Sequence, residues 1–390
     1  MESFDVVIIG AGAAGLMCAM TAGNRGRRVL LLEHNAEAGA KILISGGGRC
    51  NFTNVEIAPE RFLSANPHFC KSALSRYTQH DFIAMVERHR IRYHEKTLGQ
   101  LFCDGSAREI LAMLFAECAG ARVDLRTRHS VTGITRADRF CIETNRGPFD
   151  APALVLATGG LSIPKMGATG FAYDIARRFD LPIVEPRPGL VPIKTTGETL
   201  ELCQTLAGVS VEAIVSCRRD SFRENILFTH RGLSGPAILQ ISSYWREGDT
   251  LSIDLAPSMH IESLLADRKR TRPKAELKTI LAEALPTRLA QGLAGTAGNL
   301  PIANVPDRSI SELANRLKRW QVKPAGSEGW PKAEVTVCGI DTAALSSKTM
   351  EARAVPGLFA IGEAVDVTGW LGGYNFQWAW SSGWCAGNAV

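Results

Sequence analysis

Residues 4–15 read FDVVIIGAGAAG, and this stretch decides the fold. Its four consecutive apolar residues, Val6 to Ile9, predict a strand that is buried on both faces, as in a parallel sheet. Gly10 then permits a tight turn, Gly12 lets the backbone approach a pyrophosphate, and Gly15 lets a helix pack against the strand. The stretch therefore predicts the glycine-rich turn of a dinucleotide-binding fold.

A helix is expected over residues 13–23, with its positive N-terminus pointing at the phosphates and with Ala13 and Ala14 among the contacts. A second strand, residues 28–32, ends in Glu33. A carboxylate at that position accepts hydrogen bonds from a ribose diol and repels a 2′-phosphate. The unit therefore favours the adenosine part of FAD or NAD over NADP. The alternative is a glycine-rich turn that binds nothing.

The composition is that of an ordinary globular enzyme, long enough for two or three domains. The chain has 390 residues, of which 45% are hydrophobic and 21% charged, and its net charge is +5. This mild charge permits nucleic-acid or other anionic partners without requiring them. Because residues 4–9 already predict a strand, we expect no signal peptide, and no apolar stretch reaches the ~20 residues that span a bilayer. We expect a soluble, cytoplasmic protein with no membrane contact.

Ten cysteines are scattered along the chain, with no CxxC pair and no zinc-ligand spacing of Cys and His. We therefore expect no metal site and mostly buried thiols in a reducing compartment. Cys50 is the exception, because the neighbouring Arg49 would lower its pKa. Cys50 would then protonate the carbon opposite the hydride in the reduction of an activated C=C bond. The alternative is an inert, packed thiol.

Residues 39–54, GAKILISGGGRCNFTN, are too glycine-rich for a helix and too polar for a core strand. Such a loop would lie against an isoalloxazine ring and its substrate face. Arg49 would stabilise an anionic reduced flavin or an enolate-like intermediate, or would form a structural salt bridge, and Lys41 has the same two interpretations. The cofactor contacts expected in this segment are Lys41, Ser45, Gly46, Gly47, Arg49, Cys50 and Asn51.

Residues 153–157 predict a further buried strand, which is followed by the small residues Thr158, Gly159 and Gly160. A strand that ends in small residues leaves space for a dinucleotide in the crevice beside it. Short strands of a meander are expected at residues 122–125, 130–136 and 139–143, and Val131 is counted among the cofactor contacts. The contacts expected on the adenosine or pyrophosphate side are Ala157, Thr158, Gly159 and Gly160.

The C-terminal segment decides between FAD and NAD. Residues 358–364, LFAIGEA, predict a short strand that enters a glycine turn. In two-dinucleotide-fold flavoproteins such a strand returns to the N-terminal sheet, and an acid after it, here Asp366, binds the ribityl or pyrophosphate region. A helix beginning near residues 374–377 would point its N-terminus at the negative charge of a reduced flavin. The contacts expected here are Gly362, Glu363, Asp366, Gly372, Gly373, Tyr374 and Asn375.

The character of the chain changes near residue 190, where alternating antiparallel strands begin. We expect residues 1–189 and 333–390 to form one discontinuous FAD-binding domain. Residues 190–332 would form an inserted substrate or cap domain, with a helical part at about residues 258–322.

Three further features have two interpretations each. Tyr173 follows a glycine-containing loop and is either a proton donor or a packed side chain. His230 and Arg231 lie in a loop of the inserted domain and either hold an anionic substrate or are solvated. The basic run over residues 268–274 is either a solvated helix end or a contact to phosphates.

Four motifs occur in order along the chain: GAKILISGGGRCNFTN, GGLSIPKMGATGFAYDIA, LFTHRGLSGPAIL and GYNFQWAWSSG. On these motifs, which run over essentially its whole length, the sequence resembles the YhiN/BaiN-type flavoproteins, known as NAD(P)/FAD-dependent oxidoreductases. The resemblance implies an α/β fold in which a Rossmann-like FAD domain is interrupted by a β-barrel-like domain and a small helical piece. It also implies bound FAD, which we expect to be non-covalent. One departure is Cys338-Gly339, where the family usually has paired glycines.

We therefore predict an FAD-dependent oxidoreductase that transfers a hydride between the flavin and an organic substrate. By resemblance, the leading reaction is dihydrouridine formation from uracil in ribosomal RNA. The alternatives are a small enone-like metabolite, including a steroid, or a flavin redox sensor without turnover. Because FAD would fill the single GxGxxG turn, NADH or NADPH would visit the flavin transiently. An oxidase or a protein electron donor are the other options.

Overall fold

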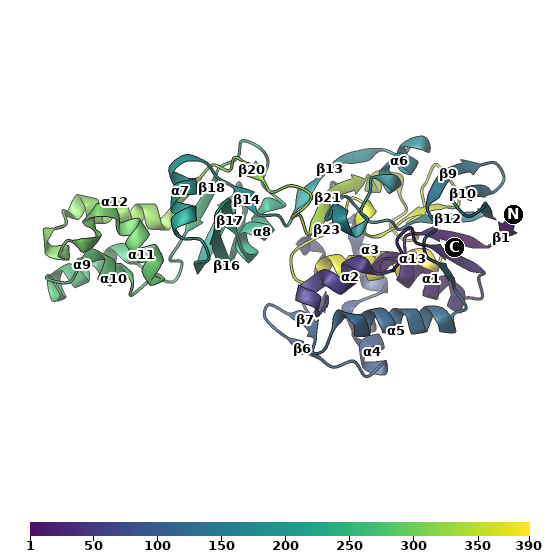
Figure 1. Ribbon diagram of the computed structural model, residues 1–390, viewed down its shortest axis with the longest axis horizontal. Helices are drawn as coiled ribbons and strands as arrows, with labels where there is room; N and C mark the ends of the chain where they lie inside the picture. Colours follow the sequence, from purple (N-terminus) through teal and green to yellow (C-terminus); the bar gives the residue numbers. More distant parts are fainter. The chain divides into compact units, whose positions relative to one another are not determined.

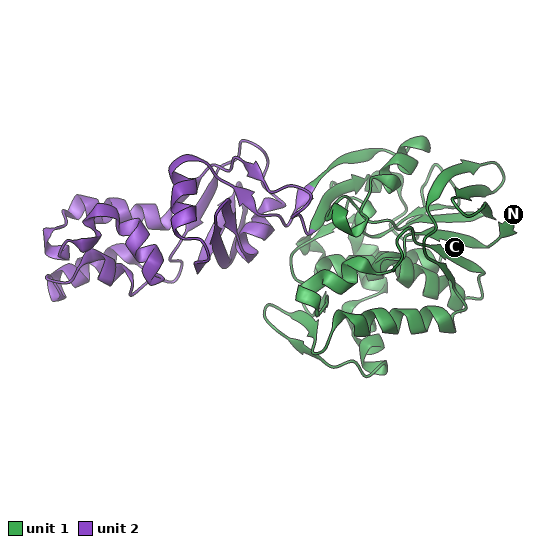
Figure 2. Cartoon of the chain, viewed as in Figure 1, with its two compact units in different colours: residues 1–187, 335–390 green, residues 188–334 purple.

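The computed structural model describes residues 1–390, which divide into two compact units (Figure 2). Unit 1 comprises residues 1–187 and 335–390, and unit 2 comprises residues 188–334. The borders expected from the sequence were 189/190 and 332/333. None of the helices is both long enough and apolar enough to cross a membrane.

A five-stranded parallel sheet forms the centre of unit 1, with the order β22-β12-β2-β3-β8. Figure 1 labels its strand β12. Its first four strands in this order are fully buried, because helices or other strands cover both faces. The strand near residue 358 pairs with β12, so the C-terminal segment returns to the N-terminal sheet as expected. The strands are β2 (Val6–Ile9), β3 (Val29–Leu32), β8 (Asp124–Arg126), β12 (Ala153–Leu156) and β22 (Leu358–Ala360).

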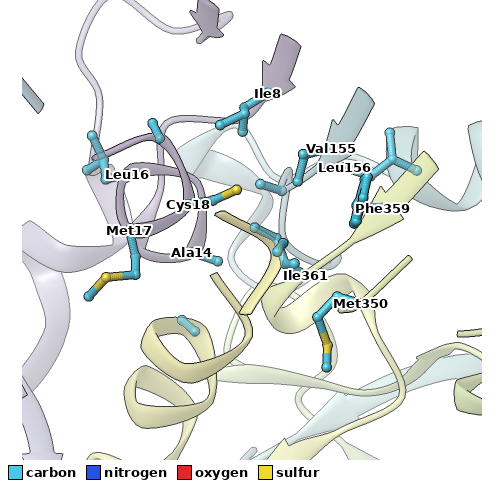
Figure 3. Close-up of a cluster of buried hydrophobic side chains, with 14 of the residues drawn as sticks. Ile8, Ala14, Leu16, Met17, Cys18, Val155, Leu156, Met350, Phe359 and Ile361 are labelled. Carbon is cyan, nitrogen blue, oxygen red and sulfur yellow. The ribbon is translucent and has the colours of Figure 1, made fainter. Parts of the chain in front are cut away.

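Two helices from opposite ends of the chain, α1 (Ala13–Asn24) and α13 (Tyr374–Gly387), pack against each other. Their close approach depends on small residues: a Cβ on Gly383 would lie 2.5 Å from the carbonyl oxygen of Ala14. Helix α5 (Ala107–Gly120) also packs against α1. Figure 3 shows the core beside α1, where Ile8 and Phe359 come from two strands of the sheet.

A second sheet, with the order β1-β11-β10-β9, contains the predicted meander but lacks one of its expected strands. The prediction that residues 122–125 belong to the meander was wrong, because β8 pairs in parallel with β3 at the edge of the central sheet. The crossover through α5 returns the chain to that sheet, and three residues are too few for a periodic signal. The strands are β1 (Glu2–Ser3), β9 (Val131–Arg136), β10 (Phe140–Thr144) and β11 (Phe149–Ala151).

Residues 39–54 contain regular structure that the sequence analysis did not predict. They form α2 (Ala40–Ile44), the 3₁₀ turn η1 (Ser45–Gly48) and the strand β4 (Asn51–Asn54). The polar residues of β4 are tolerated because partners far along the chain satisfy them: Thr53 donates to Gln377 of α13 at 2.7 Å. Strand β4 pairs with β7 (Gln100–Cys103), which forms a hairpin with β6 (Tyr93–Glu95).

The remaining elements of unit 1 connect these sheets. The longer ones are α3 (Phe69–Arg76), α4 (Gln79–Arg88), α6 (Phe171–Arg178), and β13 (Ile183–Gly189), which continues into unit 2 and pairs with β21 (Val335–Ile340). Short strands β5 (Phe62–Leu63) and β23 (Thr368–Gly369) pair with each other. The other 3₁₀ turns are η2 (Pro59–Arg61), η3 (Pro164–Met166), η6 (Thr342–Ala344) and η7 (Gly362–Ala364).

Unit 2 is built on a seven-stranded antiparallel sheet with the order β19-β18-β15-β16-β17-β14-β20. Helix α8 (Pro236–Ser242) packs on β16, and a helical piece follows β18 in the chain. The strands are β14 (Ile193–Lys194), β15 (Ser210–Cys217), β16 (Asp220–Thr229), β17 (Gly232–Ser234), β18 (Leu251–Asp254), β19 (Trp320–Val322) and β20 (Gly326–Ser327). The other helices are α7 (Gly197–Thr205), α9 (Ile261–Thr271), α10 (Leu277–Leu281), α11 (Thr287–Ala294) and α12 (Asp307–Lys318), with 3₁₀ turns η4 (Gly295–Asn299) and η5 (Ile302–Asn304).

Candidate functional site

The three glycines of the N-terminal turn have the environments that a dinucleotide site needs. Gly10 has a φ of +105°, and a Cβ there would lie 2.5 Å from the carbonyl oxygen of Ala157. A Cβ on Gly15 would lie 1.9 Å from the carbonyl oxygen of Gly10, so only glycine allows α1 to approach β2 this closely. Beside Gly12, by contrast, no atom lies within 4 Å of the Cβ position. That open space lies at the N-terminus of α1, where no side chain caps the helix.

Glu33 lies at the end of β3, where a ribose-binding carboxylate is expected. It is 7% exposed, and its two oxygens accept hydrogen bonds from the backbone N–H groups of Ala11 (3.1 Å) and Asn35 (2.9 Å). The His129 N–H donates to the Glu33 carbonyl at 2.9 Å, so the segment that leads to Val131 and β9 passes the end of β3. Each carboxylate oxygen keeps a lone pair for a further donor. The geometry therefore fits a ribose diol.

The end of β12 supplies a buried hydroxyl without a partner. The Thr158 Oγ1 is buried and makes no hydrogen bond, and no atom lies within 4 Å of a Cβ position on Gly159. Gly160 differs, because its Cβ would lie 2.2 Å from the Thr336 Oγ1. An unsatisfied buried hydroxyl beside open space fits a ligand that is rich in oxygen atoms. Together with Gly12 and Glu33, the residues present fit the adenosine and pyrophosphate part of a dinucleotide.

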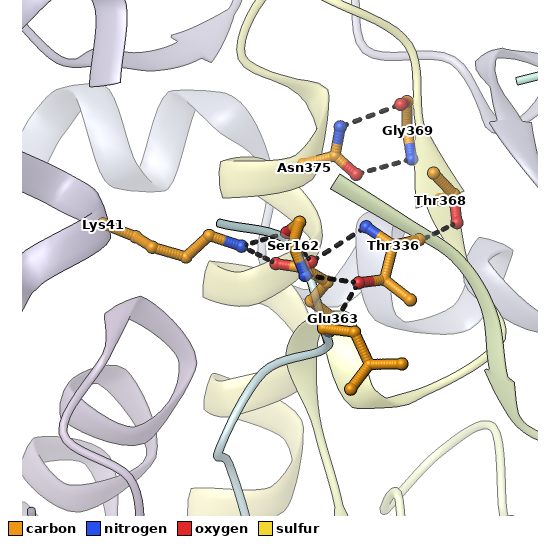
Figure 4. A network of polar contacts seen from close by, with 8 residues as sticks. Lys41, Ser162, Thr336, Glu363, Thr368, Gly369 and Asn375 are labelled. Carbon is orange, nitrogen blue, oxygen red and sulfur yellow. Dashed lines mark hydrogen bonds and ion pairs between the residues drawn. The ribbon is translucent and has the colours of Figure 1, made fainter. Parts of the chain in front are cut away.

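Lys41 of α2 belongs to a closed polar network with the C-terminal segment (Figure 4). Its Nζ lies 2.6 Å from Glu363 Oε2 and donates to Ser162 Oγ at 2.6 Å. The other oxygen of Glu363 accepts from Ser162 Oγ at 2.7 Å and from the Thr336 N–H at 2.9 Å. Burial alone would raise the pKa of Glu363, but the Lys41 ammonium and these hydrogen bonds outweigh it and hold the pKa below its usual value.

This network settles which of two interpretations describes Lys41 in the structure. Its ammonium forms a salt bridge with a carboxylate instead of projecting as a free charge. The network connects α2 to the loop after β12, to β21 and to the turn η7. It therefore fixes the base of the glycine-rich segment against the remainder of unit 1.

The glycine-rich turn itself is open. Gly46 and Gly47 have left-handed backbone conformations, with φ of +57° and +66°, and both are exposed. The Arg49 side chain at the end of the turn is exposed and has no carboxylate partner. Asn51, with its amide oriented to satisfy its neighbours, donates to the Leu101 carbonyl and accepts from the Gly373 N–H. The Ser45 hydroxyl donates to the Ile42 carbonyl at 2.7 Å, so the turn presents its glycine backbone and the unpaired Arg49 guanidinium.

The expected lowering of the Cys50 pKa was wrong. The Cys50 thiol is fully buried, and burial raises its pKa to about 12. The reason is that the Arg49 side chain lies at the surface, so desolvation of the thiolate is not compensated by a neighbouring charge. A thiol in this environment is not positioned to give a proton to a substrate.

Tyr173, the other candidate proton donor, and His230, a candidate contact for an anionic substrate, differ in exposure. Tyr173 of α6 is 2% exposed, its hydroxyl has no hydrogen-bond partner, and burial raises its pKa above the usual range. His230 is exposed in the turn between β16 and β17. Its neighbour Arg231 is ion-paired with Glu328 at 3.2 Å. Tyr173 is thus a packed side chain, whereas the imidazole of His230 is accessible.

The C-terminal motif positions a helix terminus, as expected. Helix α13 begins at Tyr374, after Gly372 and Gly373, whose φ angles are +111° and +94°. The Tyr374 hydroxyl bonds to the Arg61 guanidinium, and the Asn375 amide bonds on both sides to Gly369 at 2.8 Å. These two side chains therefore fix the turn, and what remains for a cofactor is the helix terminus.

Asp366 is buried at 2% exposure and accepts from the Ala65 N–H at 2.8 Å. Burial raises its pKa to about 6.

Gly362, another contact expected in the C-terminal segment, donates its N–H to Ser382 of α13 at 3.0 Å. Ser162, Thr336 and Arg61 could not be identified from the sequence, because single Ser, Thr and Arg residues carry no pattern that reveals their partners.

Two curated relatives are similar over their full length. A protein of Escherichia coli (strain K12) named "Ribosomal RNA dihydrouridine synthase" is 51% identical over 396 residues, which cover 100% of this chain and 99% of the relative. A protein of the same name from Haemophilus influenzae is 47% identical, with 97% of each chain covered. A more distant relative, the "3-dehydro-bile acid delta(4,6)-reductase" of Clostridium scindens, is 27% identical with 98% of each chain covered.

A similar fold occurs in a solved structure, the 3-ketosteroid-delta4-(5alpha)-dehydrogenase from Rhodococcus jostii RHA1. The match has a TM-score of 0.51 and 14% identity, and it covers 99% of this chain and 97% of the other. At this identity the similarity shows the fold alone.

The family assignment confirms three expectations from the sequence. The fold is α/β with a Rossmann-like flavin-binding domain, the cofactor is a flavin, and the protein is an enzyme of the FAD-dependent oxidoreductase class. The model of the HI0933-like protein Rossmann domain matches residues 4–389. The chain therefore belongs to the HI0933-like flavoprotein family.

Proposed function

We propose that this flavin-dependent oxidoreductase reduces the C5=C6 bond of a uracil base in ribosomal RNA, forming dihydrouridine. The observation that carries this proposal is the 51% identity, end to end, with a protein named for that reaction. The candidate site agrees with it, because unit 1 contains both a nucleotide-binding turn and an exposed, unpaired cation.

The residues that would hold FAD are those whose environment leaves room for it. The adenosine and pyrophosphate part would lie against Gly12, Glu33 and Thr158. The N-terminus of α13 would face the flavin, where its dipole stabilises negative charge. When bound and reduced, the flavin supplies a hydride to one carbon of the double bond, while a proton reaches the other carbon and the flavin is left oxidised.

The chain itself must orient the base and stabilise its developing charge. Hydride addition to a uracil ring leaves negative charge on the ring and its carbonyl oxygen. Arg49 is exposed and unpaired, and its planar guanidinium suits such an oxygen. The proton has to come from an accessible group, which excludes Cys50 and Tyr173 as they lie in this structure. His230 of unit 2 stays a candidate contact for an anionic substrate, and a His230→Gln variant with unchanged kcat and KM would remove it.

The electron donor is proposed to be NADH or NADPH, which would visit the flavin without a second dinucleotide fold. Only one glycine-rich nucleotide turn is present in the chain. Stopped-flow mixing with each nucleotide separately should bleach the flavin absorbance with at least one of them. If neither causes bleaching, the electron donor is a protein or the enzyme works as an oxidase.

A second candidate is the reduction of a small conjugated enone. The observation that favours it is the 27% identity, over 98% of both chains, with a relative named as a bile-acid reductase. The two functions are separated by deletion of the gene. Loss of dihydrouridine from ribosomal RNA, restored by the intact gene, supports the RNA substrate, whereas an unchanged content supports the small molecule.

A further inference from the structure

We propose that four residues of unit 1, namely Ile44, Arg49, Lys96 and Leu98, form a docking surface for single-stranded RNA beside the target base. We call this set the hairpin surface, because two of its residues lie at the tip of the β6–β7 hairpin. The inference rests on the proposed function, and it adds the place and the chemistry of RNA recognition.

The hairpin and the glycine-rich turn form one continuous structure. The Cys103 N–H donates to the Arg49 carbonyl at 3.0 Å, so the end of the turn is bonded to β7. Phe102 lies between the two, because a Cβ on Gly46 would lie 2.8 Å from its ring and the Lys96 Nζ lies 5.3 Å from its ring centroid. Arg49 and Lys96 are therefore cations of one local surface.

The hairpin tip is held in place although it is exposed. The buried Asn54 amide donates to the carbonyl oxygens of Leu98 and Gly372, each at 2.9 Å. The same bonds connect the tip to the glycine pair that precedes α13. A tip fixed by a buried side chain presents its residues at little entropic cost when a ligand binds.

The exposed residues of this surface are apolar as well as basic. Leu98 is 57% exposed and Ile44 is 44% exposed. Large hydrophobic side chains are exposed at only two further positions, Met1 and Leu300. Exposed apolar side chains beside cations match an unpaired nucleic-acid strand, which offers the faces of its bases and its phosphates together.

The cations of this surface lack acidic partners. Neither Arg49 nor Lys96 forms an ion pair, and Asp104, the acid at the base of the hairpin, is bonded to His94 at 2.8 Å. Glu95 is the acid that remains unpaired on the hairpin. Unpaired cations attract phosphate more strongly than cations that already hold a carboxylate.

The basic run of α9 in unit 2 is different in this respect. Arg268 and Arg272 are paired with Glu283 at 2.9 and 2.6 Å. Lys269 is paired with Asp307 at 2.7 Å, and Arg270 with Asp267 at 3.0 Å. Of the run, only Lys274 has no acidic partner. We therefore assign RNA docking to the hairpin surface and not to this run.

The test uses a double variant that combines Lys96→Glu with Leu98→Ser. Its control is Lys274→Glu, which makes the same charge change at the end of the basic run. The probe is protein-free ribosomal RNA from a strain that lacks the gene, titrated at one fixed salt concentration. We expect Lys96→Glu and Leu98→Ser together to weaken RNA binding at least about tenfold, and Lys274→Glu to change it less than about twofold. Lys96→Arg should restore wild-type affinity. Flavin content and the thermal midpoint show whether each variant is folded.

The outcomes separate this inference from the proposed function. The hairpin surface alone is overturned if the folded Lys96→Glu, Leu98→Ser variant binds RNA with wild-type affinity while the wild-type enzyme still forms dihydrouridine. An equal loss in Lys274→Glu also overturns it, because the effect would then be one of net charge. A wild-type enzyme that neither binds nor modifies the RNA overturns the proposed function itself.

Discussion

Two cations of the same glycine-rich segment, Lys41 and Arg49, have opposite environments. Lys41 lies in a closed network with Glu363 and Ser162, and its charge is used to hold unit 1 together. Arg49 lies at an exposed turn without an acidic partner. The same contrast separates the hairpin surface from the ion-paired run of α9. A basic residue is thus available to a substrate only where the fold leaves its charge unpaired.

The largest effect is expected for Arg49→Ala, which removes the unpaired charge. If Arg49 stabilises charge on the reacting base, kcat should fall by about 10²–10³-fold, as when one stabilising donor is lost from an active site. The thermal midpoint should stay unchanged, because the side chain has no partner in the fold. Rates of dihydrouridine formation at saturating RNA measure this effect.

The control is Arg146→Ala, which removes an exposed arginine from the turn between β10 and β11. It should keep the wild-type kcat. A KM increase without a change in kcat for Arg49→Ala would show that the residue belongs to RNA docking alone, and full activity would contradict both roles.

Arg49→Ala should lower kcat and leave stability unchanged, whereas Lys41→Met should mainly lower stability. It leaves the partly buried Glu363 carboxylate without its cation, which we expect to cost about 2–3 kcal/mol of unfolding free energy because the pair is partly solvated. Urea unfolding measures the loss. Lys71→Met, an exposed lysine of α3 without an ion pair, is the matched control.

A second substitution sharpens this test. The Lys41→Met, Glu363→Gln double variant removes the uncompensated charge and should recover most of the lost stability. If the single variant were as stable as the control, the network would not hold the segment in place.

Asp366→Asn should make stability depend less on pH. The pKa of Asp366 is raised from 3.8 to about 6 in the folded chain, so the stability that is present below about pH 4 is lost as the pH rises through about 6. The variant should therefore be more stable than the wild type by about 2 kcal/mol at pH 8, and the difference should vanish below about pH 4. Chemical unfolding across this range measures it. A constant difference would mean that Asp366 is not the titrating group.

The smallest effect is expected for Cys50→Ala. Loss of a buried thiol should reduce stability by about 1 kcal/mol, and turnover should stay within about twofold of the wild type. The physical reason is that a fully buried thiol with a pKa of about 12 does not exchange a proton with substrate. A loss of turnover as large as that of Arg49→Ala, with normal flavin content, would return Cys50 to the mechanism.

The sequence predicts those parts of the fold whose signals are local. Four apolar residues followed by Gly10, Gly12 and Gly15 identify strand, turn and helix without knowledge of anything distant. The return of the strand near Leu358 to the same sheet could also be anticipated, because its motif is contiguous.

The sequence does not predict elements whose partners are remote. Strand β4 is polar, and its Thr53 and Asn54 side chains are tolerated because Gln377 and the Gly372 carbonyl bond to them. The raised pKa of Cys50 has the same origin, since the direction of the Arg49 side chain, and not its place in the sequence, decides whether it acts on the thiol. Ser162 and Thr336 join the Lys41 network for reasons visible only in three dimensions.

Reduction of uracil in ribosomal RNA is tested by mass analysis of ribosomal RNA that has been treated with the purified flavoprotein. Protein-free RNA from a strain that lacks the gene would be incubated with the enzyme and NADH or NADPH, and its nucleosides would be quantified. We expect a uridine to gain two hydrogens with the wild-type enzyme, and the same product to form about 10²–10³-fold more slowly with Arg49→Ala. Absence of dihydrouridine, under conditions in which the same enzyme preparation reduces a conjugated enone, would contradict it.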